Sequence, residues 1–214
     1  VLLFSTVSVV AKQNLEWALA EATFQGNVSL VETLLNDGAS SDAVDRFGNS
    51  ALVKAIGEGH LDVARRLLEK GADANTKTKD GTSVLMRAAV HDHFDLVKLL
   101  LDKGAEVNAK ANDGSTALLC AAVMEHPSIV GLLRSHGAEV TLPIAAMLGD
   151  KAEVQRLIKV GADLNGQGPH GWTALMNAAQ RGHVQVMELL IEKGANLNAS
   201  REDGSTALMD AVGS

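Results

Sequence analysis

Apolar residues recur along this chain in pairs of short stripes separated by glycine. In one representative stretch, Leu52, Ala55 and Ile56 are spaced so that they share one face of a helix of about two turns. Gly59 can adopt the left-handed conformation that ends such a helix. A second apolar stripe follows over residues 61–68. The pattern predicts two short helices joined by a tight turn, followed by a loop rich in turn-forming Asp, Asn and Gly.

The two-stripe pattern repeats every 33 residues. The leucines of the first stripe stand at Leu19, Leu52, Leu85, Leu118, Leu142, Leu175 and Leu208, and the glycines after the second at Gly38, Gly71, Gly104, Gly137, Gly161 and Gly194. One step in each series is 24 residues, so a single unit lacks nine residues. A fixed period of this length is typical of solenoids built from stacked units.

Helices this short are unstable alone, so each unit must bury its apolar face against its neighbours. Pairs of alanine in the first helices would permit that close approach. We therefore predict a mainly α solenoid of stacked helix-turn-helix units joined by β-hairpin loops, forming a single array over residues 1–214. The expected units are 1–14 (partial), 15–44, 45–77, 78–110, 111–140, 141–165 (shortened), 166–199 and 200–214 (partial).

The repeat resembles the ankyrin repeat. The best match reads Gly-Trp-Thr-Ala-Leu-Met-Asn-Ala-Ala-Gln-Arg-Gly-His over 171–183, followed by Leu-Leu-Ile-Glu-Lys-Gly-Ala-Asn-Leu-Asn over 189–198. The resemblance covers residues 15–214. The sequence departs from the family pattern because the consensus Pro and His of the first helix are replaced by apolar residues, and Asp92 and Glu125 replace the glycine between the helices. These two turns are expected to carry backbone strain.

Composition narrows the possible partners. Aromatic residues make up only 3% of the chain and the formal net charge is −7, with no run of basic residues, so nucleic acid binding is not expected. The single cysteine, Cys120, lies in an apolar stretch and is expected to be a buried, inert thiol. Residues 1–11 are apolar but too short to cross a membrane. A cytoplasmic location is expected, or a secreted or periplasmic one if residues 1–11 are the remnant of a signal peptide.

No motif indicates catalysis, a cofactor or a metal. The most suggestive pair is His91 and His93, but a zinc site needs three or four converging ligands. No Gly-x-Ser-x-Gly elbow and no phosphate-binding glycine loop is present, so we expect no enzyme activity and no cofactor. His60 and His183 follow the turn glycines, where their expected role is a structural hydrogen bond.

The resemblance implies that a partner is bound by the hairpin tips and by the ends of the first helices that face the groove. The positions that this implies are Arg46, Phe47, Asn49, Glu58, Lys79, Asp80, Thr82, Val90, His91, Asn112, Asp113, Ser115, Val123, Met124, His170, Trp172, Gln180, Arg181, Glu202, Asp203 and Ser205. Phe47 and Trp172 are the expected anchors, since aromatic residues at exposed tips are typical of interfaces. The alternative is that each ring folds back onto its own hairpin.

Two classes of function remain open at this point. The favoured interpretation is a protein–protein interaction module, a scaffold, adaptor or effector segment, that binds another protein through the concave hairpin and groove surface. The alternative is a regulatory or targeting arm of a larger enzyme whose catalytic domain lies outside this chain. The partner is expected to be a protein and neither nucleic acid nor membrane, with the chain a monomer or part of a longer protein.

The shortened unit should keep both helices and lose only its hairpin. Ala145 and Ala146 stay in register with the alanines of the next unit, whereas turn residues are missing between Val140 and Leu142. Pro143 falls in the first turn of the helix, where its missing N–H is tolerated. The missing hairpin predicts a notch in the row of tips, with Met147 and Leu148 partly exposed beside it.

The histidine pair gives the first testable prediction. Protein dialysed against zinc-free buffer should retain no stoichiometric zinc by atomic absorption, because His91 and His93 alone supply too few ligands. Retained zinc that disappears in the His91→Ala/His93→Ala variant would contradict this expectation.

Overall fold

The computed structural model describes residues 2–45, 48–201 and 203–212, and the side chains of residues 13–45, 48–201 and 203–209. The chain divides into two compact units, Val1–Asn112 and Asp113–Ser214. The helices of the first are α1 (Leu2–Phe24), α2 (Val28–Asn36), α3 (Ala51–Gly57), α4 (Leu61–Glu69), α5 (Val84–Val90) and α6 (Phe94–Asp102). Those of the second are α7 (Ala117–Val123), α8 (Pro127–Ser135), α9 (Leu142–Met147), α10 (Lys151–Lys159), the 3-10 turn η1 (Pro169–Gly171), α11 (Ala174–Gln180), α12 (Val184–Glu192) and α13 (Ala207–Val212).

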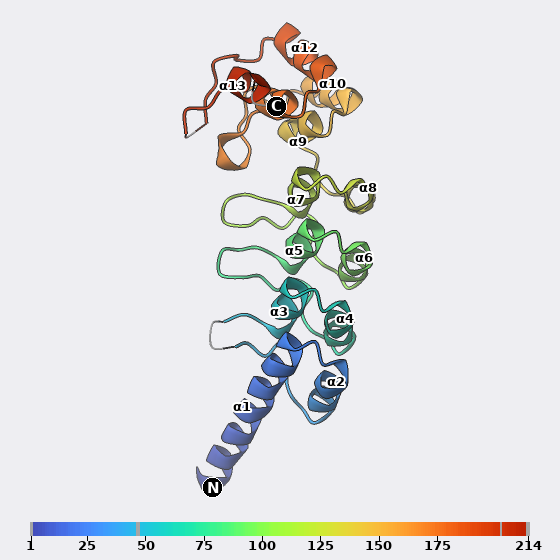
Figure 1. Cartoon of the computed structure of the whole chain (residues 1–214), viewed down its shortest axis with the longest axis vertical. Coiled ribbons are helices and arrows are strands. Elements are labelled where there is room, and N and C mark those ends of the chain that lie inside the picture. The colour runs from blue at the N-terminus through green and yellow to red at the C-terminus, as the bar shows by residue number, and fades with distance from the viewer. Residues whose placement is uncertain (1, 46–47, 202, 213–214) are drawn as a thin grey trace. The chain divides into compact units, whose positions relative to one another are not determined.

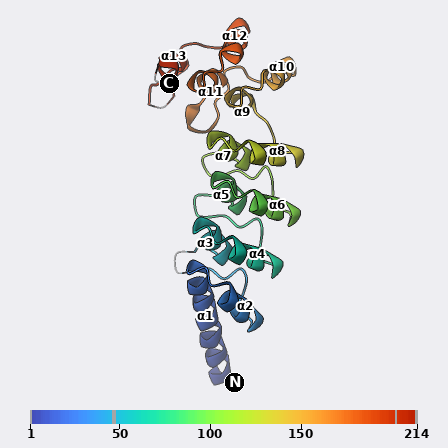
Figure 2. The same cartoon turned by 45° about the vertical axis from the view of Figure 1, so that its right-hand side comes forward.

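Within the first unit the helices form two rows. The first helices α3 and α5 lie in one row with the end of α1, and the second helices α2, α4 and α6 lie in the other (Figures 1 and 2). The connections before α3 and α5 project away from the second helices (Figure 1). The mainly helical, stacked fold predicted from the 33-residue period is therefore confirmed.

The hairpins contain very little β-structure. Among the described residues, their pairing is limited to single antiparallel bridges, which join Val44 to Ser50, Lys77 to Ser83, and Ser200 to Thr206. Each hairpin is held instead by short turns and side-chain hydrogen bonds at its tip.

The first helix differs from the sequence expectation. A unit boundary was expected near residue 14, but α1 runs without interruption from Leu2 to Phe24. This stretch contains neither glycine nor proline, so nothing in it ends the helix before Gly26. Across the described residues no helix combines the length and the apolar character that spanning a bilayer requires.

Small side chains make the close stacking of first helices possible. The expected alanine pairs are fully or almost fully buried in Ala88/Ala89, Ala121/Ala122, Ala145/Ala146 and Ala178/Ala179. In the second unit, Ala178 lies in one apolar cluster with residues of α9, α11, α12 and α13. Polar N-caps start these helices: the hydroxyl of Ser50 accepts from the Val53 N–H at 3.2 Å, and that of Thr173 from the Met176 N–H at 3.3 Å.

The strained turns predicted from sequence are present. Asp92 has a φ of 57° and Glu125 a φ of 58°, both in the left-handed region that favours glycine. Each follows a first helix and reverses the chain into α6 or α8. The aligned turns of other units hold glycine in the same conformation, so these two side chains are tolerated at an energetic cost.

Relief of this strain is measurable. We expect Asp92→Gly to raise the free energy of unfolding by about 0.5–1 kcal/mol, because glycine adopts the left-handed conformation without the penalty of a Cβ. Urea denaturation measures the change. A loss of stability would mean that contacts of the Asp92 side chain outweigh the strain.

Packing at the alanine register is also testable. Ala178→Leu should lower the free energy of unfolding by about 1–3 kcal/mol, because a buried position in a close-packed stack has no room for the added atoms. Gln180→Leu is the matched control, since it adds leucine to the same helix at an exposed position and should change stability by about 0.5 kcal/mol or less. Equal midpoints for the two variants would contradict the packing role.

Candidate partner-binding surface

The middle of the first helix α3 faces the hairpin that precedes it. In α3 this is shown by Lys54, whose Nζ lies 3.2 Å from Oδ2 of Asp45 at the base of the preceding hairpin. Asp45 also accepts a hydrogen bond from the Asn49 N–H at 3.0 Å. This hairpin and α3 therefore form one continuous surface.

Adjacent hairpins in the first unit are joined by backbone and amide hydrogen bonds. The Asn112 N–H donates to the carbonyl of Asp80 at 3.0 Å, and its side-chain amide donates to the carbonyl of Lys79 at 3.3 Å. Gly81 has a φ of 80°, and a Cβ there would lie 2.7 Å from Oδ1 of Asn112, so only glycine fits this contact. The joined hairpins hold the exposed Lys79 and Asp80 side chains at fixed positions.

Two histidines join neighbouring repeats, as expected from sequence. Nε2 of His60 lies 2.9 Å from the carbonyl oxygen of Phe24, and Nε2 of His183 lies 2.9 Å from that of Met147. The His183 ring packs over Gly149, where a Cβ would lie 2.8 Å from the ring. These histidines satisfy carbonyls at the ends of first helices, so the predicted structural role is confirmed.

The shortened repeat has lost its hairpin, as the sequence predicts. Residues 136–141 alone connect α8 to α9, whereas residues 160–173 connect α10 to α11. The side chain of Thr141 makes no capping hydrogen bond, unlike the other caps described above, and Pro143 occupies the first turn of α9. Both helices of this repeat are intact.

The expected notch is not open, because the flanking hairpins meet across the missing one. Oδ2 of Asp113 lies 3.4 Å from Nε2 of His170, and a Cβ at Gly114 would lie 3.8 Å from Cγ of Pro169. The pKa of Asp113 is held below its usual value, first by the hydrogen bond from the Ser115 N–H and also by the nearby His170. The Asp113 carboxylate thus stays ionised in this contact.

Arg181 forms a second bridge over the shortened repeat. Its guanidinium pairs with the carboxylate of Glu125, which lies 56 positions earlier in the sequence. Its Nη2 also donates to the carbonyl of Val123 at 2.7 Å, and this residue lies 58 positions earlier. Met147, expected to be partly exposed, is buried, whereas Leu148 is half-buried as expected. The prediction for Met147 was wrong because deletion of a hairpin lets its two neighbours close over α9 instead of leaving a gap.

Trp172 does not stand free at a tip. It is half-buried and packs against the apolar cluster of the second unit, with the Arg201 guanidinium 4.0 Å from its ring centroid. This position favours the alternative in which the ring folds back onto the protein. Phe47, the other expected anchor, lies outside the described residues together with Arg46 and Glu202.

The remaining predicted positions divide by exposure. Those that are exposed to solvent are Glu58, Lys79, Asp80, His91, Asn112, Asp113, Val123, Met124, His170, Gln180 and Asp203. Those that are half-buried are Asn49, Thr82, Val90, Ser115, Arg181 and Ser205. Val123 and Met124 are 46% and 47% exposed, which is high for apolar side chains next to a buried helix face.

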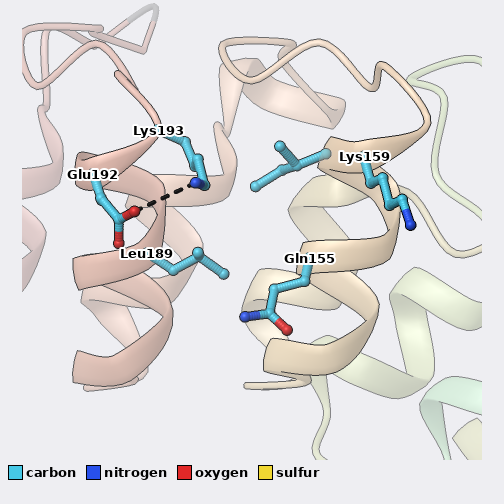
Figure 3. Close-up of a pocket in the computed structure, with 6 residues that line it drawn as sticks. Gln155, Lys159, Leu189, Glu192 and Lys193 are labelled. Atoms are coloured by element: carbon cyan, nitrogen blue, oxygen red, sulfur yellow. Dashed lines mark hydrogen bonds and ion pairs between the residues drawn. The ribbon is translucent and has the colours of Figure 1, made fainter.

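Sequence reasoning missed a groove between α10 and α12. The groove has a volume of about 520 Å³ and is lined by Gln155, Ile158, Lys159, Leu189, Glu192 and Lys193 (Figure 3). Leu189 points from α12 toward α10, whereas the amine of Lys159 points away (Figure 3). Lys193 is paired with Glu192 at 3.3 Å, so the groove presents little unbalanced charge. The half-buried Ile158 in α10 gave no sequence signal of this groove, since its spacing is that of a core residue.

The titratable groups that the sequence singles out are the histidine pair His91 and His93 and the thiol of Cys120. His91 and His93 stack with ring centroids 5.8 Å apart, and burial, with a smaller effect of His91, lowers the pKa of His93. Within the described part of the chain, no group of three His, Cys, Asp or Glu side chains could hold a metal ion. Burial raises the pKa of the Cys120 thiol to about 11, which leaves it protonated and unreactive at neutral pH.

Comparisons with known proteins agree with this geometry. A family model described as "Ankyrin repeats (3 copies)" matches residues 15–111, 73–144 and 142–214. Among solved structures, the crystal structure of the human ASB11 ankyrin repeat domain is similar, with 28% sequence identity and a TM-score of 0.62 over 90% of each chain. A comparison with curated proteins gives no match.

The bridge over α9 can be measured by a double-mutant cycle with Arg181→Met and Glu125→Gln. We expect a coupling energy of about 0.2–1 kcal/mol in urea denaturation, because one partner is largely exposed and water screens the pair. The coupling should shrink at high salt. Additive effects of the two substitutions would contradict a bridge in solution.

Proposed function

The chain belongs to the ankyrin-repeat family, and on that premise we propose that it binds a partner protein through the surface formed by its hairpins and first helices. Ankyrin repeats are in general protein-interaction modules, and they are typically non-catalytic. The role proposed for this chain is that of a scaffold, adaptor or effector segment, which holds its partner without changing it covalently.

The observation that carries the proposal is the exposed apolar pair Val123 and Met124. They end α7 and enter the turn to α8, at the helix ends that the family resemblance places on the groove side. Arg181 bonds the Val123 carbonyl, so the backbone under this pair is fixed before any partner arrives. Rigid, exposed apolar side chains ringed by polar groups are favourable anchors for a protein interface, because little conformational entropy is lost on binding.

Site-specific photocrosslinking tests the surface. The photoreactive residue p-benzoylphenylalanine would replace Met124 in one variant and Ile191 in the other, since these apolar side chains are 47% and 45% exposed. Ile191 lies on the second helix α12, away from the proposed surface. We expect one specific crosslinked protein from the Met124 position and none from the Ile191 position.

The captured partner then permits a binding measurement. Met124→Glu should weaken its affinity by about tenfold or more, because a charge would be buried at the interface. Ile191→Glu should leave the affinity unchanged. Crosslinks that form only from the Ile191 position would place the interface on the second helices and overturn the proposal.

A further inference from the structure

Among the described residues of the first unit, Arg87 lacks the acidic partner that the aligned Lys54 has one repeat earlier. Lys54 is neutralised by Asp45, and the residues 33 positions later are Arg87 and Thr78. Among the ion pairs between described residues, none includes Arg87. By its register Arg87 lies on the same face of its helix as Lys54. It therefore presents an uncompensated guanidinium to this surface.

Gly57 leaves space for the Arg87 side chain. Nη1 of Arg87 lies 3.5 Å from the position that a Cβ would take at Gly57, near the end of the neighbouring helix α3. The aligned residues Val90 and Val123 carry side chains at this position. Arg87 is half-buried there, which limits its rotamers and favours its planar donors as a fixed recognition group.

Three lysines extend the positive charge over the hairpins. Lys77, Lys79 and Lys110 are exposed, and the ion pairs found in the described residues include none of them. The stem of Lys79 crosses the preceding hairpin, with Cε 3.5 Å from the position of a Cβ at Gly48. We call Lys77, Lys79, Arg87 and Lys110 the basic hairpin surface.

The acidic groups nearby do not cancel this charge. Asp80 is ionised, since hydrogen bonds from the hydroxyls of Thr78 and then Thr82 lower its pKa, and these donors occupy its oxygens. Glu58 follows the Gly57 that Arg87 approaches, and Asp92 lies in the turn after α5. Among the ion pairs between described residues, none joins Arg87 to either carboxylate. The four cations of the basic hairpin surface thus outnumber the nearby Asp80, Glu58 and Asp92, in a chain whose formal net charge is −7.

The charge is confined to the first unit. In the second unit, the residues that align with Lys77 and Lys110 are Gln167 and Ser200, and those that align with Arg87 are Cys120, Ile144, Asn177 and Asp210. None of these six residues is basic, so these positions carry no cation in the second unit. The basic hairpin surface is thus a property of particular repeats and does not follow from the repeat pattern itself.

We propose that the basic hairpin surface binds an acidic peptide segment of the partner protein. Arg87 takes one carboxylate through its paired N–H donors, and the lysines attract the segment to the hairpins. This inference rests on the proposed function and adds the chemical class of the partner. A peptide is favoured over nucleic acid because a net charge of −7 repels a long polyanion, whereas a short acidic segment meets only the local positive surface.

Fluorescence anisotropy with a fluorescein-labelled octaglutamate peptide tests this directly on the whole chain. The unmodified protein should bind the peptide, with an affinity that falls as salt is raised. Arg87→Glu should weaken binding by about tenfold or more, and Lys79→Glu by about threefold. Arg87→Lys should weaken it too, since lysine keeps the charge but loses the planar fork.

Lys98→Glu is the matched control. Lys98 is an exposed lysine of α6, its substitution changes the net charge by the same amount as Lys79→Glu, and it lies outside the basic hairpin surface. Its affinity for the peptide should equal that of the unmodified protein. Circular dichroism melting of each variant, with Arg87→Gln as a milder change, separates lost binding from lost folding.

Three results would overturn the proposal. They are an absence of octaglutamate binding by the unmodified protein, equal weakening by Lys98→Glu and Lys79→Glu, and tighter binding of a labelled oligothymidylate than of the peptide. A Met124 crosslink that persists alongside any of these results leaves the proposed function intact. If no crosslink forms from the Met124 position, the proposed function is contradicted, whatever the peptide-binding experiment gives.

Discussion

The structure depends on the close approach of short first helices, which only small buried side chains allow. A helix of two turns cannot hold its own backbone in water, so it must bury one face against the repeats on either side. Ala145 and Ala178 are fully buried where α9 and α11 pack together. Because backbone positions are fixed by this contact, the hairpins that begin each first helix are also fixed.

The shortened repeat shows that the stacking of the helices does not require a hairpin in every repeat. Loss of one hairpin leaves α9 and α10 in place, because the stacking contacts come from the helices. The consequence appears in the side chains: Arg181 reaches Glu125, and Asp113 approaches His170, across the repeat that lacks its own hairpin. The loss of one hairpin is thus accompanied by contacts between two repeats that are not adjacent in sequence.

Repeats that share a fold differ in what they present to a partner. Lys54 and Arg87 occupy the same helix position in successive repeats. Among the ion pairs between described residues, Lys54 has one and Arg87 has none, because Asp45 is followed one period later by Thr78. Such differences cost little stability, since the positions lie at the edge of the core. The side chains exposed at these positions can therefore differ between repeats while the packing of the helices stays the same.

The sequence by itself determined the period, the helix pairs, the buried alanines and the strained turns at Asp92 and Glu125, because each follows from local spacing or from the conformational limits of a residue type. It also located the missing hairpin. Only the tertiary structure decided that Met147 is buried and that Trp172 folds against the core. These outcomes depend on contacts between residues far apart in sequence, such as Arg181 with Glu125, which no local pattern records.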